Sequence, residues 1–286
     1  MALTLGAAFL QNVRSLLQKR LTGTLSVNGA TYVRFLYAVP FAWLYAAYLW
    51  WGDSPGFTTL FWVYVLFAAT AQIAATAALL GSFTTGNFAV GTAFSKTEAA
   101  QAAVFGLVIL GDTVSGVGLA GIAISLVGVI LLSGTLTIRQ LLRPDRQMWL
   151  GLAAAAGFAI SAVGFRGASL GLDDGTYLER AGLTVAVAVS LQTILMGGYL
   201  LAFEPGELRR TLGQYRVAVW VGLIGMVASV GWFTAMTLKN AAVVRAVGQV
   251  ELLFTLITSV WLLKEKIKLR EIVGIVCVVL GIILLI

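Results

Sequence analysis

The sequence predicts an all-α integral membrane protein whose ten transmembrane helices form two inverted five-helix repeats. Of its 286 residues, 59% are hydrophobic and only 11% are charged, whereas a soluble domain carries about 25% charged residues. A spanning helix needs about 20 apolar residues, so lipid is the expected solvent for most of the chain. Long stretches without Asp, Glu, Lys or Arg include 54–95, 113–138, 147–165, 181–203 and 217–238.

The second half of the chain repeats the first at one constant offset, which aligns Glu98 with Glu251 and Lys96 with Gln249. The same offset aligns Asp112, Gly121, Ile122, Gly128, Ile130, Leu131 and Leu132 with Glu265, Gly274, Ile275, Gly281, Ile283, Leu284 and Leu285. With five spans in each half, the second copy enters the bilayer from the opposite side. Inverted repeats give two related conformations, each open to one side, with the binding site near the midplane. This pattern favours a transporter that works by alternating access.

The first half is divided by short polar turns. The predicted spans are about 2–20, 31–51, 58–80, 88–110 and 115–134. The first is the most polar, and we interpret it as a span rather than a signal peptide because no basic region precedes it. Pro40 is the one proline inside a span and is predicted to kink the second helix.

The second half follows the longest polar link of the chain, residues 135–147. Its predicted spans are about 148–168, 177–203, 215–238, 242–263 and 272–286. The acidic turn Asp173-Asp174-Gly175 separates the sixth span from the seventh, and Lys239-Asn240 separates the eighth from the ninth. Asp112 and Glu265 lie in short turns and are interpreted as groups that begin helices, because carboxylates favour helix N-termini.

Composition excludes several functions. The chain has no histidine, so the commonest general base and metal ligand is missing, and no cofactor or metal is expected. The net charge of +7 lies mostly in short connections, which indicates membrane orientation rather than nucleic-acid binding.

No Gly-x-x-x-x-Gly-Lys-Ser/Thr loop for ATP is present. Transport is therefore expected to be downhill or ion-coupled, with Glu98 or Glu251 as a candidate proton carrier.

Ionisable and amide side chains within apolar segments are the candidate solute-binding groups, because such residues in a membrane usually have a function. Glu98 shares a helix face with Gln101, and Arg245 shares one with Gln249. The predicted substrate-binding residues are Lys96, Glu98, Gln101, Arg245, Gln249, Glu251, Gln11, Arg14, Trp232 and Tyr177.

Structural alternatives to solute binding stay open for these residues. Glu98 and Glu251 could instead pair with Lys96, Arg245 or main-chain groups near a helix break and only fix the packing. Arg14 could extend to the membrane surface, and the aromatic residues could be interfacial anchors. The stripe on which Glu251 lies also contains Thr255 and Thr258, and Thr92 matches Arg245 in the first half.

The repeated pattern resembles the EamA module of the drug/metabolite transporter superfamily. The first copy reads Glu98-Ala99, Leu110-Gly111-Asp112 and a Gly-rich helix from Gly121 to Leu132. The second copy reads Glu251-Leu252, Leu263-Lys264-Glu265 and Gly274 to Leu285. The proline that usually follows the glutamate is absent from both. The resemblance implies EamA-like repeats at 1–134 and 148–286 around a central cavity, with helices three, four, eight and nine near it.

In function, the resemblance implies a monomeric, multi-pass protein of the cell inner (plasma) membrane that exports amino acids, aromatic ones included, or similar small metabolites. Export of cationic drugs and transport of nucleotide-linked solutes are the alternatives, and an integral membrane enzyme is a remote one. The basic residues cluster in odd-numbered connections, so the positive-inside rule places both termini outside. The resemblance implies termini inside, and the sequence leaves this conflict open.

Overall fold

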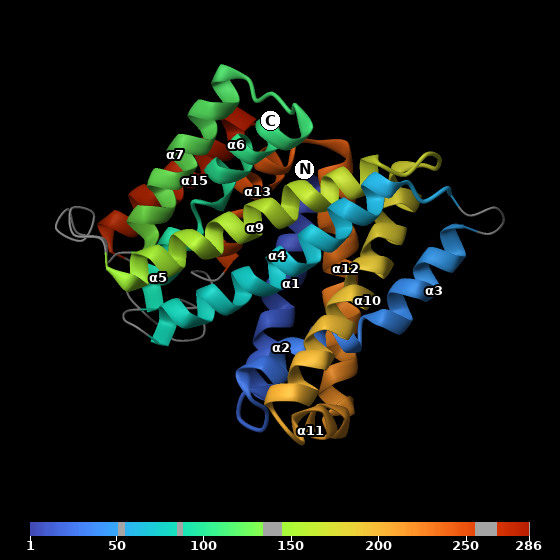
Figure 1. Cartoon of the computed structure of the whole chain (residues 1–286). Coiled ribbons are helices and arrows are strands. Elements are labelled where there is room, and N and C mark those ends of the chain that lie inside the picture. Colours follow the sequence, from blue (N-terminus) through green and yellow to red (C-terminus); the bar gives the residue numbers. More distant parts are fainter. Residues whose placement is uncertain (51–54, 85–87, 134–144, 255–267, 286) are drawn as a thin grey trace. The chain divides into compact units, whose positions relative to one another are not determined.

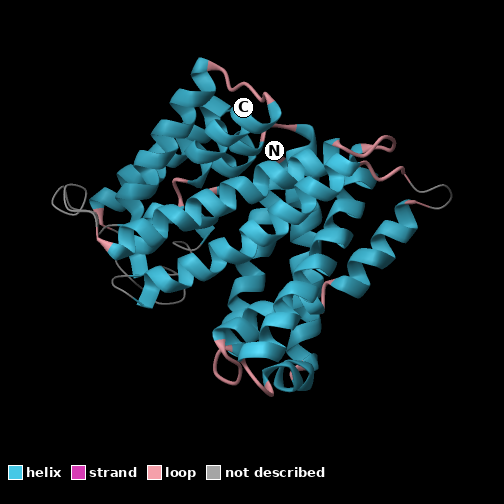
Figure 2. Cartoon of the chain, in the orientation of Figure 1, coloured by secondary structure: helices cyan, strands magenta, loops and turns pink. Residues whose placement is uncertain are grey.

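The computed structural model describes residues 1–50, 55–84, 88–133, 145–254 and 268–285. Within these ranges the chain is helical nearly throughout, as Figure 2 shows. Extended pairing in the described residues is limited to one isolated antiparallel bridge between Phe57 and Leu172. The prediction of an all-α protein is therefore confirmed.

The helices of the first half follow the predicted spans, with one predicted interruption and one that was not predicted (Figure 1). They are α1 (Ala2–Leu21), α2 (Val27–Leu36), α3 (Val39–Leu49), α4 (Thr59–Thr84), α5 (Phe88–Ser95), α6 (Glu98–Leu110) and α7 (Gly116–Ser133). The second span is divided into α2 and α3, and Pro40 lies in the first turn of α3. Proline lacks an N–H group and its ring clashes with the preceding turn, so the predicted kink at Pro40 is confirmed as a break.

The helices of the second half are α9 (Arg146–Leu170), α10 (Tyr177–Phe203), α11 (Glu207–Gly213), α12 (Tyr215–Leu238), α13 (Ala241–Gly248) and α15 (Leu269–Leu285). Helices α10 and α12 have the predicted bounds, whereas the short α11 lies in a link predicted to be non-helical. Residues 251–254 are also helical. Three predicted features lie outside the described residues. They are most of the 135–147 link, the later part of the ninth span with Thr255 and Thr258, and the turn that contains Glu265.

Two predicted spans are interrupted at equivalent points of the repeat. Helix α5 ends at Ser95 and α6 begins at Glu98, while α13 ends at Gly248 and helix resumes at residue 251. At both breaks two successive N–H groups donate three residues back: Lys96 and Thr97 to Ala93 and Phe94, and Gln249 and Val250 to Ala246 and Val247. Such tight turns interrupt the four-residue ladder of the α-helix. The offset of the sequence repeat is thus reproduced in the backbone geometry.

The chain divides into two compact units, and each draws on both halves of the sequence. Unit 1 consists of Met1 with residues 71–163 and 239–286, and unit 2 consists of residues 2–70 and 164–238. The division falls within α4 and within α9. The units therefore do not coincide with the predicted repeats at 1–134 and 148–286. The bounds of the two repeats stay a prediction.

In unit 1, helices α7 and α15 lie side by side, as Figure 1 shows, and they meet at glycines. A Cβ atom on Gly121 would lie 2.8 Å from the carbonyl oxygen of Gly281, and one on Gly128 would lie 2.7 Å from that of Gly274. The contacts run in opposite directions along the two helices, so the pair is antiparallel. Glycine permits this close approach of the two backbones.

In unit 2, α1 packs against α12, also antiparallel. A Cβ atom on Gly231 would lie 3.0 Å from that of Ala7, and one on Gly225 would lie 3.1 Å from the Cδ atom of Arg14. Near the other end of α1, a buried apolar cluster joins α1, α2 and α12. Its members are Leu21, Leu25, Ala30, Val33, Ala218 and Val221.

The outer surface of the helices is apolar, as a membrane protein requires. Large side chains such as Leu44, Val108 and Ile194 are 69%, 76% and 69% exposed, and lipid is the solvent in which such exposure is favourable. Among the described residues, five stretches are long and apolar enough to span a membrane: Thr59–Ser82, Ala93–Leu110, Arg146–Leu170, Tyr177–Phe203 and Tyr215–Leu238. The other five predicted spans stay predictions.

Candidate functional site

The two broken spans bring four charged side chains together in unit 1. The ammonium group of Lys96, at the first break, forms an ion pair with the carboxylate of Glu251, just after the second. Arg245, in the last turn of α13, lies with Nη1 4.0 Å from Oε1 of Glu98, the first residue of α6. Each pair joins one residue from each half of the sequence. Pairing of this kind is what we expect if the charges fix the packing of the helices rather than bind a solute.

Each charge also matches the helix end at which it lies. Lys96 follows the C-terminus of α5 and Arg245 lies near that of α13, where the helix dipole is negative. Glu98 and Glu251 each begin a helical segment, where the dipole is positive. Each break therefore places a helix C-terminus and a helix N-terminus within one apolar span. The two bases lie at the C-termini and the two acids lie at the N-termini.

The site is enclosed but not sealed, and its four formal charges cancel. The side chains of Lys96 and Glu251 are 14% and 17% exposed, and those of Arg245 and Glu98 are 13% and 11% exposed. Removing one partner of an enclosed ion pair costs about 3–5 kcal/mol, because the other charge is left uncompensated. The pairs therefore hold each other in place, and a small part of each of the four side chains stays exposed.

Gln249 links both breaks through its side-chain amide. Its Nε2 donates to the main-chain carbonyl of Lys96 at 3.1 Å, and its Oε1 accepts from Oγ of Ser125 at 2.7 Å. Ser125 was not among the predicted residues, because it lies in a charge-free run. Its equivalent in the second half is Val278, so the repeat gave no signal either.

Gln101 lies one turn after Glu98 and faces the first break. Its Nε2 donates to Oγ1 of Thr97 at 3.0 Å and to the carbonyl of Leu152 on α9 at 3.5 Å. The Thr97 hydroxyl in turn donates to the carbonyl of Phe94 at 2.7 Å. The predicted residues Lys96, Glu98, Gln101, Arg245, Gln249 and Glu251 thus lie around the two breaks, all in unit 1.

The other four predicted residues belong to unit 2. Trp232 is 7% exposed, and its indole Nε1 donates to Oε1 of Gln11 at 3.1 Å. The aliphatic part of Arg14 packs beside Gly225. Tyr177 begins α10 and is 47% exposed. A role for Gln11, Arg14, Trp232 or Tyr177 in solute binding stays a prediction.

Charges at other helix ends have structural partners. Glu179 and Thr176 form a capping box at the start of α10, and Nη1 of Arg166 donates to the carbonyl of Met236 at 2.6 Å near the end of α12. The expectation that Asp112 begins a helix is wrong. Asp112 follows Gly111, which ends α6 with φ of 70°, and its N–H donates to the Gly106 carbonyl at 3.0 Å. It therefore ends α6, and α7 begins only at Gly116.

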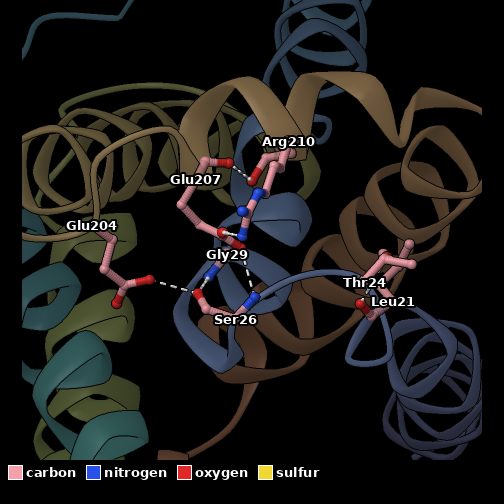
Figure 3. A network of polar contacts seen from close by, with 8 residues as sticks. Leu21, Thr24, Ser26, Gly29, Glu204, Glu207 and Arg210 are labelled. Carbon is pink, nitrogen blue, oxygen red and sulfur yellow. Dashed lines mark hydrogen bonds and ion pairs between the residues drawn. The ribbon is translucent and has the colours of Figure 1, made fainter.

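A second polar cluster, in unit 2, was not predicted (Figure 3). The main-chain N–H of Ser26 donates to Oε1 of Glu207 at 2.6 Å, and the Ser26 hydroxyl donates to Oε2 of Glu204 at 2.6 Å. Oε1 of Glu204 accepts from Nδ2 of Asn28 at 2.6 Å. These contacts join the start of α2 to the C-terminal end of α10 and to the first residue of α11. Neither glutamate was among the residues predicted to have a function.

Fold and site together define a multi-pass helical membrane protein with an enclosed, charge-balanced cluster at two broken helices. Residues 146–286, the C-terminal half, match the sequence model of the EamA-like transporter family. This half is therefore an EamA-like transporter domain, and its family is one of transporters rather than enzymes. The predictions of a membrane transporter and of no enzymatic activity are confirmed at this level. A domain of this family implies a secondary transporter with a small-molecule substrate.

Comparison with solved structures supports the fold over the whole chain. One structure, described only as a crystal structure of a protein, matches with a TM-score of 0.74 and 14% identity, covering 99% of this chain and 95% of the other. At that identity the likeness concerns the fold alone. A comparison with curated proteins finds no match.

Proposed function

We propose that the protein exports amino acids, aromatic ones included, or similar small metabolites across the cell inner (plasma) membrane by alternating access. The observation that carries this proposal is the cluster of Lys96, Glu98, Arg245 and Glu251 at the two helix breaks. An α-amino acid carries an ammonium and a carboxylate group. The cluster offers partners for both, and its formal charges sum to zero.

Charge balance favours this substrate class over the two alternatives. A cationic drug would be bound best by carboxylates without neighbouring bases, and a nucleotide-linked solute by an excess of basic groups. A zwitterion can exchange partners with an existing ion pair and leave no charge uncompensated. This matters in an apolar segment, where an uncompensated charge is costly.

The proposal includes ten helices in two inverted five-helix repeats, 1–134 and 148–286, around a central cavity. Two observations support it. The breaks after Ser95 and Gly248 have the same hydrogen-bond pattern at the offset of the sequence repeat. The contact of Gly121 with Gly281 becomes that of Gly274 with Gly128 when the two repeats are exchanged. An exchange of this kind is expected for antiparallel helices related by a two-fold axis.

The test is counterflow of radiolabelled amino acids in liposomes that contain the purified protein. A double variant, Lys96→Gln with Glu251→Gln, removes one ion pair without leaving a buried charge, so it is expected to fold. We expect it to lose amino-acid counterflow. Lys268→Gln, at an exposed position just before α15, is the control and should transport as the wild type does.

Two results would contradict the proposal. The wild type could move organic cations or nucleotide sugars but none of the amino acids. Alternatively, the double variant could transport amino acids with unchanged KM and maximal rate, in which case the Lys96–Glu251 pair has no part in transport.

A further inference from the structure

The break between α5 and α6 exposes main-chain groups within an apolar segment. The N–H groups of Lys96 and Thr97 donate only three residues back, so the regular ladder stops there. Main-chain groups without partners are costly at membrane depth, and a broken helix persists where other groups of the protein satisfy them. At this break, the Lys96 carbonyl accepts from the side chain of Gln249.

Gln249 is 1% exposed, and both ends of its amide are engaged. A main-chain carbonyl can only accept, so the NH₂ group must face Lys96 and the amide oxygen must face Ser125. Ser125 is itself fully buried on α7. The orientation of the amide is thus fixed by the chemistry of its neighbours, and little of it is open to a solute.

We propose that Gln249 and Ser125 are positioning residues that hold the backbone of Lys96 in place, and that neither contacts the solute. The inference rests on the proposed function and assigns Gln249 a different part from the one predicted for it. Ser125 orients the amide, the amide holds the Lys96 carbonyl, and the Lys96 ammonium thereby keeps its place beside Glu251. Positions 96 and 249 are equivalent in the two repeats but have different roles. Lys96 carries the charge, and Gln249 holds the backbone of Lys96 in place.

The side chain at 249 must donate at one end and accept at the other. Glutamate has nearly the same shape, but an ionised carboxylate has only acceptors and would face the Lys96 carbonyl with no hydrogen to share. Methionine has a similar length and neither strong donor nor strong acceptor. Both replacements therefore remove the hydrogen bond to the Lys96 carbonyl while they keep the volume of the side chain.

The experiment compares Ser125→Ala, Gln249→Met and their double variant, with Ser161→Ala as the matched control. Ser161 is also a fully buried serine of unit 1, but its hydroxyl has no hydrogen-bond partner among the described residues. Hydrogen–deuterium exchange of residues 93–101 reports on the brace, by which we mean the hydrogen bond from Gln249 to the Lys96 carbonyl. This measurement does not depend on transport. KM and maximal rate are measured with an amino acid that the wild type moves.

We expect faster exchange at 93–101 in both single variants and a KM raised about tenfold with little change in maximal rate, which corresponds to one lost buried hydrogen bond. The double variant should be no worse than Gln249→Met alone, because the two residues act in series. Gln249→Glu should be at least as impaired as Gln249→Met. Ser161→Ala should behave as the wild type in both measurements.

Three outcomes would overturn the inference. Exchange at 93–101 could be unchanged, so that no brace exists. Exchange could rise with KM unchanged, so that the contact serves packing alone. KM could rise in Gln249→Met but not in Ser125→Ala, which points to a direct contact of Gln249 with the solute. A wild type that moves no amino acid contradicts the proposed function instead, and the exchange measurement then decides on the brace by itself.

Discussion

Alanine in place of Gly128 is expected to force α7 away from α15. Its Cβ atom would lie 2.7 Å from the carbonyl oxygen of Gly274 and from the main-chain nitrogen of Val278. Ordinary contact begins at 3.4 Å, so the backbones must separate locally by about 0.7 Å, a case of overpacking that costs about 1–3 kcal/mol. The expected fall in Tm is about 2–12 °C, measured by tryptophan fluorescence of the protein in detergent.

Two further variants make this prediction specific. Gly116→Ala lies on the same helix with nothing within 4 Å of the new atom, so we expect an unchanged or slightly higher Tm because alanine favours helix. Gly274→Ala should cost about as much as Gly128→Ala, because its Cβ atom would lie 2.8 Å from the Gly128 carbonyl oxygen. If Gly128→Ala is as stable as Gly116→Ala, the close approach of the two helices is wrong. If Gly274→Ala has no cost, the two-fold exchange is wrong.

Three other changes test separate parts of the structure. Lys96→Glu should abolish a monodisperse peak in size-exclusion chromatography, and adding Glu251→Lys should restore it, because only the single variant places like charges together; an unaffected single variant would contradict the pairing. Gly29→Ala should lower Tm more than Gly23→Ala, because only the former would overlap a buried carboxylate of the cluster in Figure 3; equal effects would contradict that contact. A cysteine at the exposed Gly213, in a background without the native cysteine, should react with an impermeant reagent only from the cytoplasmic side; labelling from outside would contradict the charge-based orientation.

Helix positions could be predicted because membrane spans are long and their connections are polar. The bounds of α10 and α12 were predicted to the residue, since each consists of a long charge-free run with charged residues only in its first turn. The interruption at Pro40 could also be predicted, because proline acts on its own backbone and needs no partner. In each of these cases the cause lies within a few residues of the effect.

The other breaks could not be predicted for the opposite reason. Neither break contains a proline. The second follows Gly248, but glycine is frequent inside membrane helices, so nothing local forbids a continuous helix at either break. The first break is held by the side chain of Gln249 and by the Thr97 hydroxyl. The former comes from a segment more than 150 residues away along the chain. Ser125 was missed for a similar reason, because only the folded chain brings it to Gln249.

The two acids of the site repeat along the sequence, whereas its two bases do not. Glu98 and Glu251 occupy equivalent positions, and two carboxylates without a base are disfavoured in an apolar segment. The structure balances them with Lys96 from the first half and Arg245 from the second, and these two are not equivalent: their counterparts are Gln249 and Thr92. Each base therefore pairs with the acid of the other half. A zwitterion has two different ends, and a site that binds it in one orientation must lack the symmetry of the fold around it.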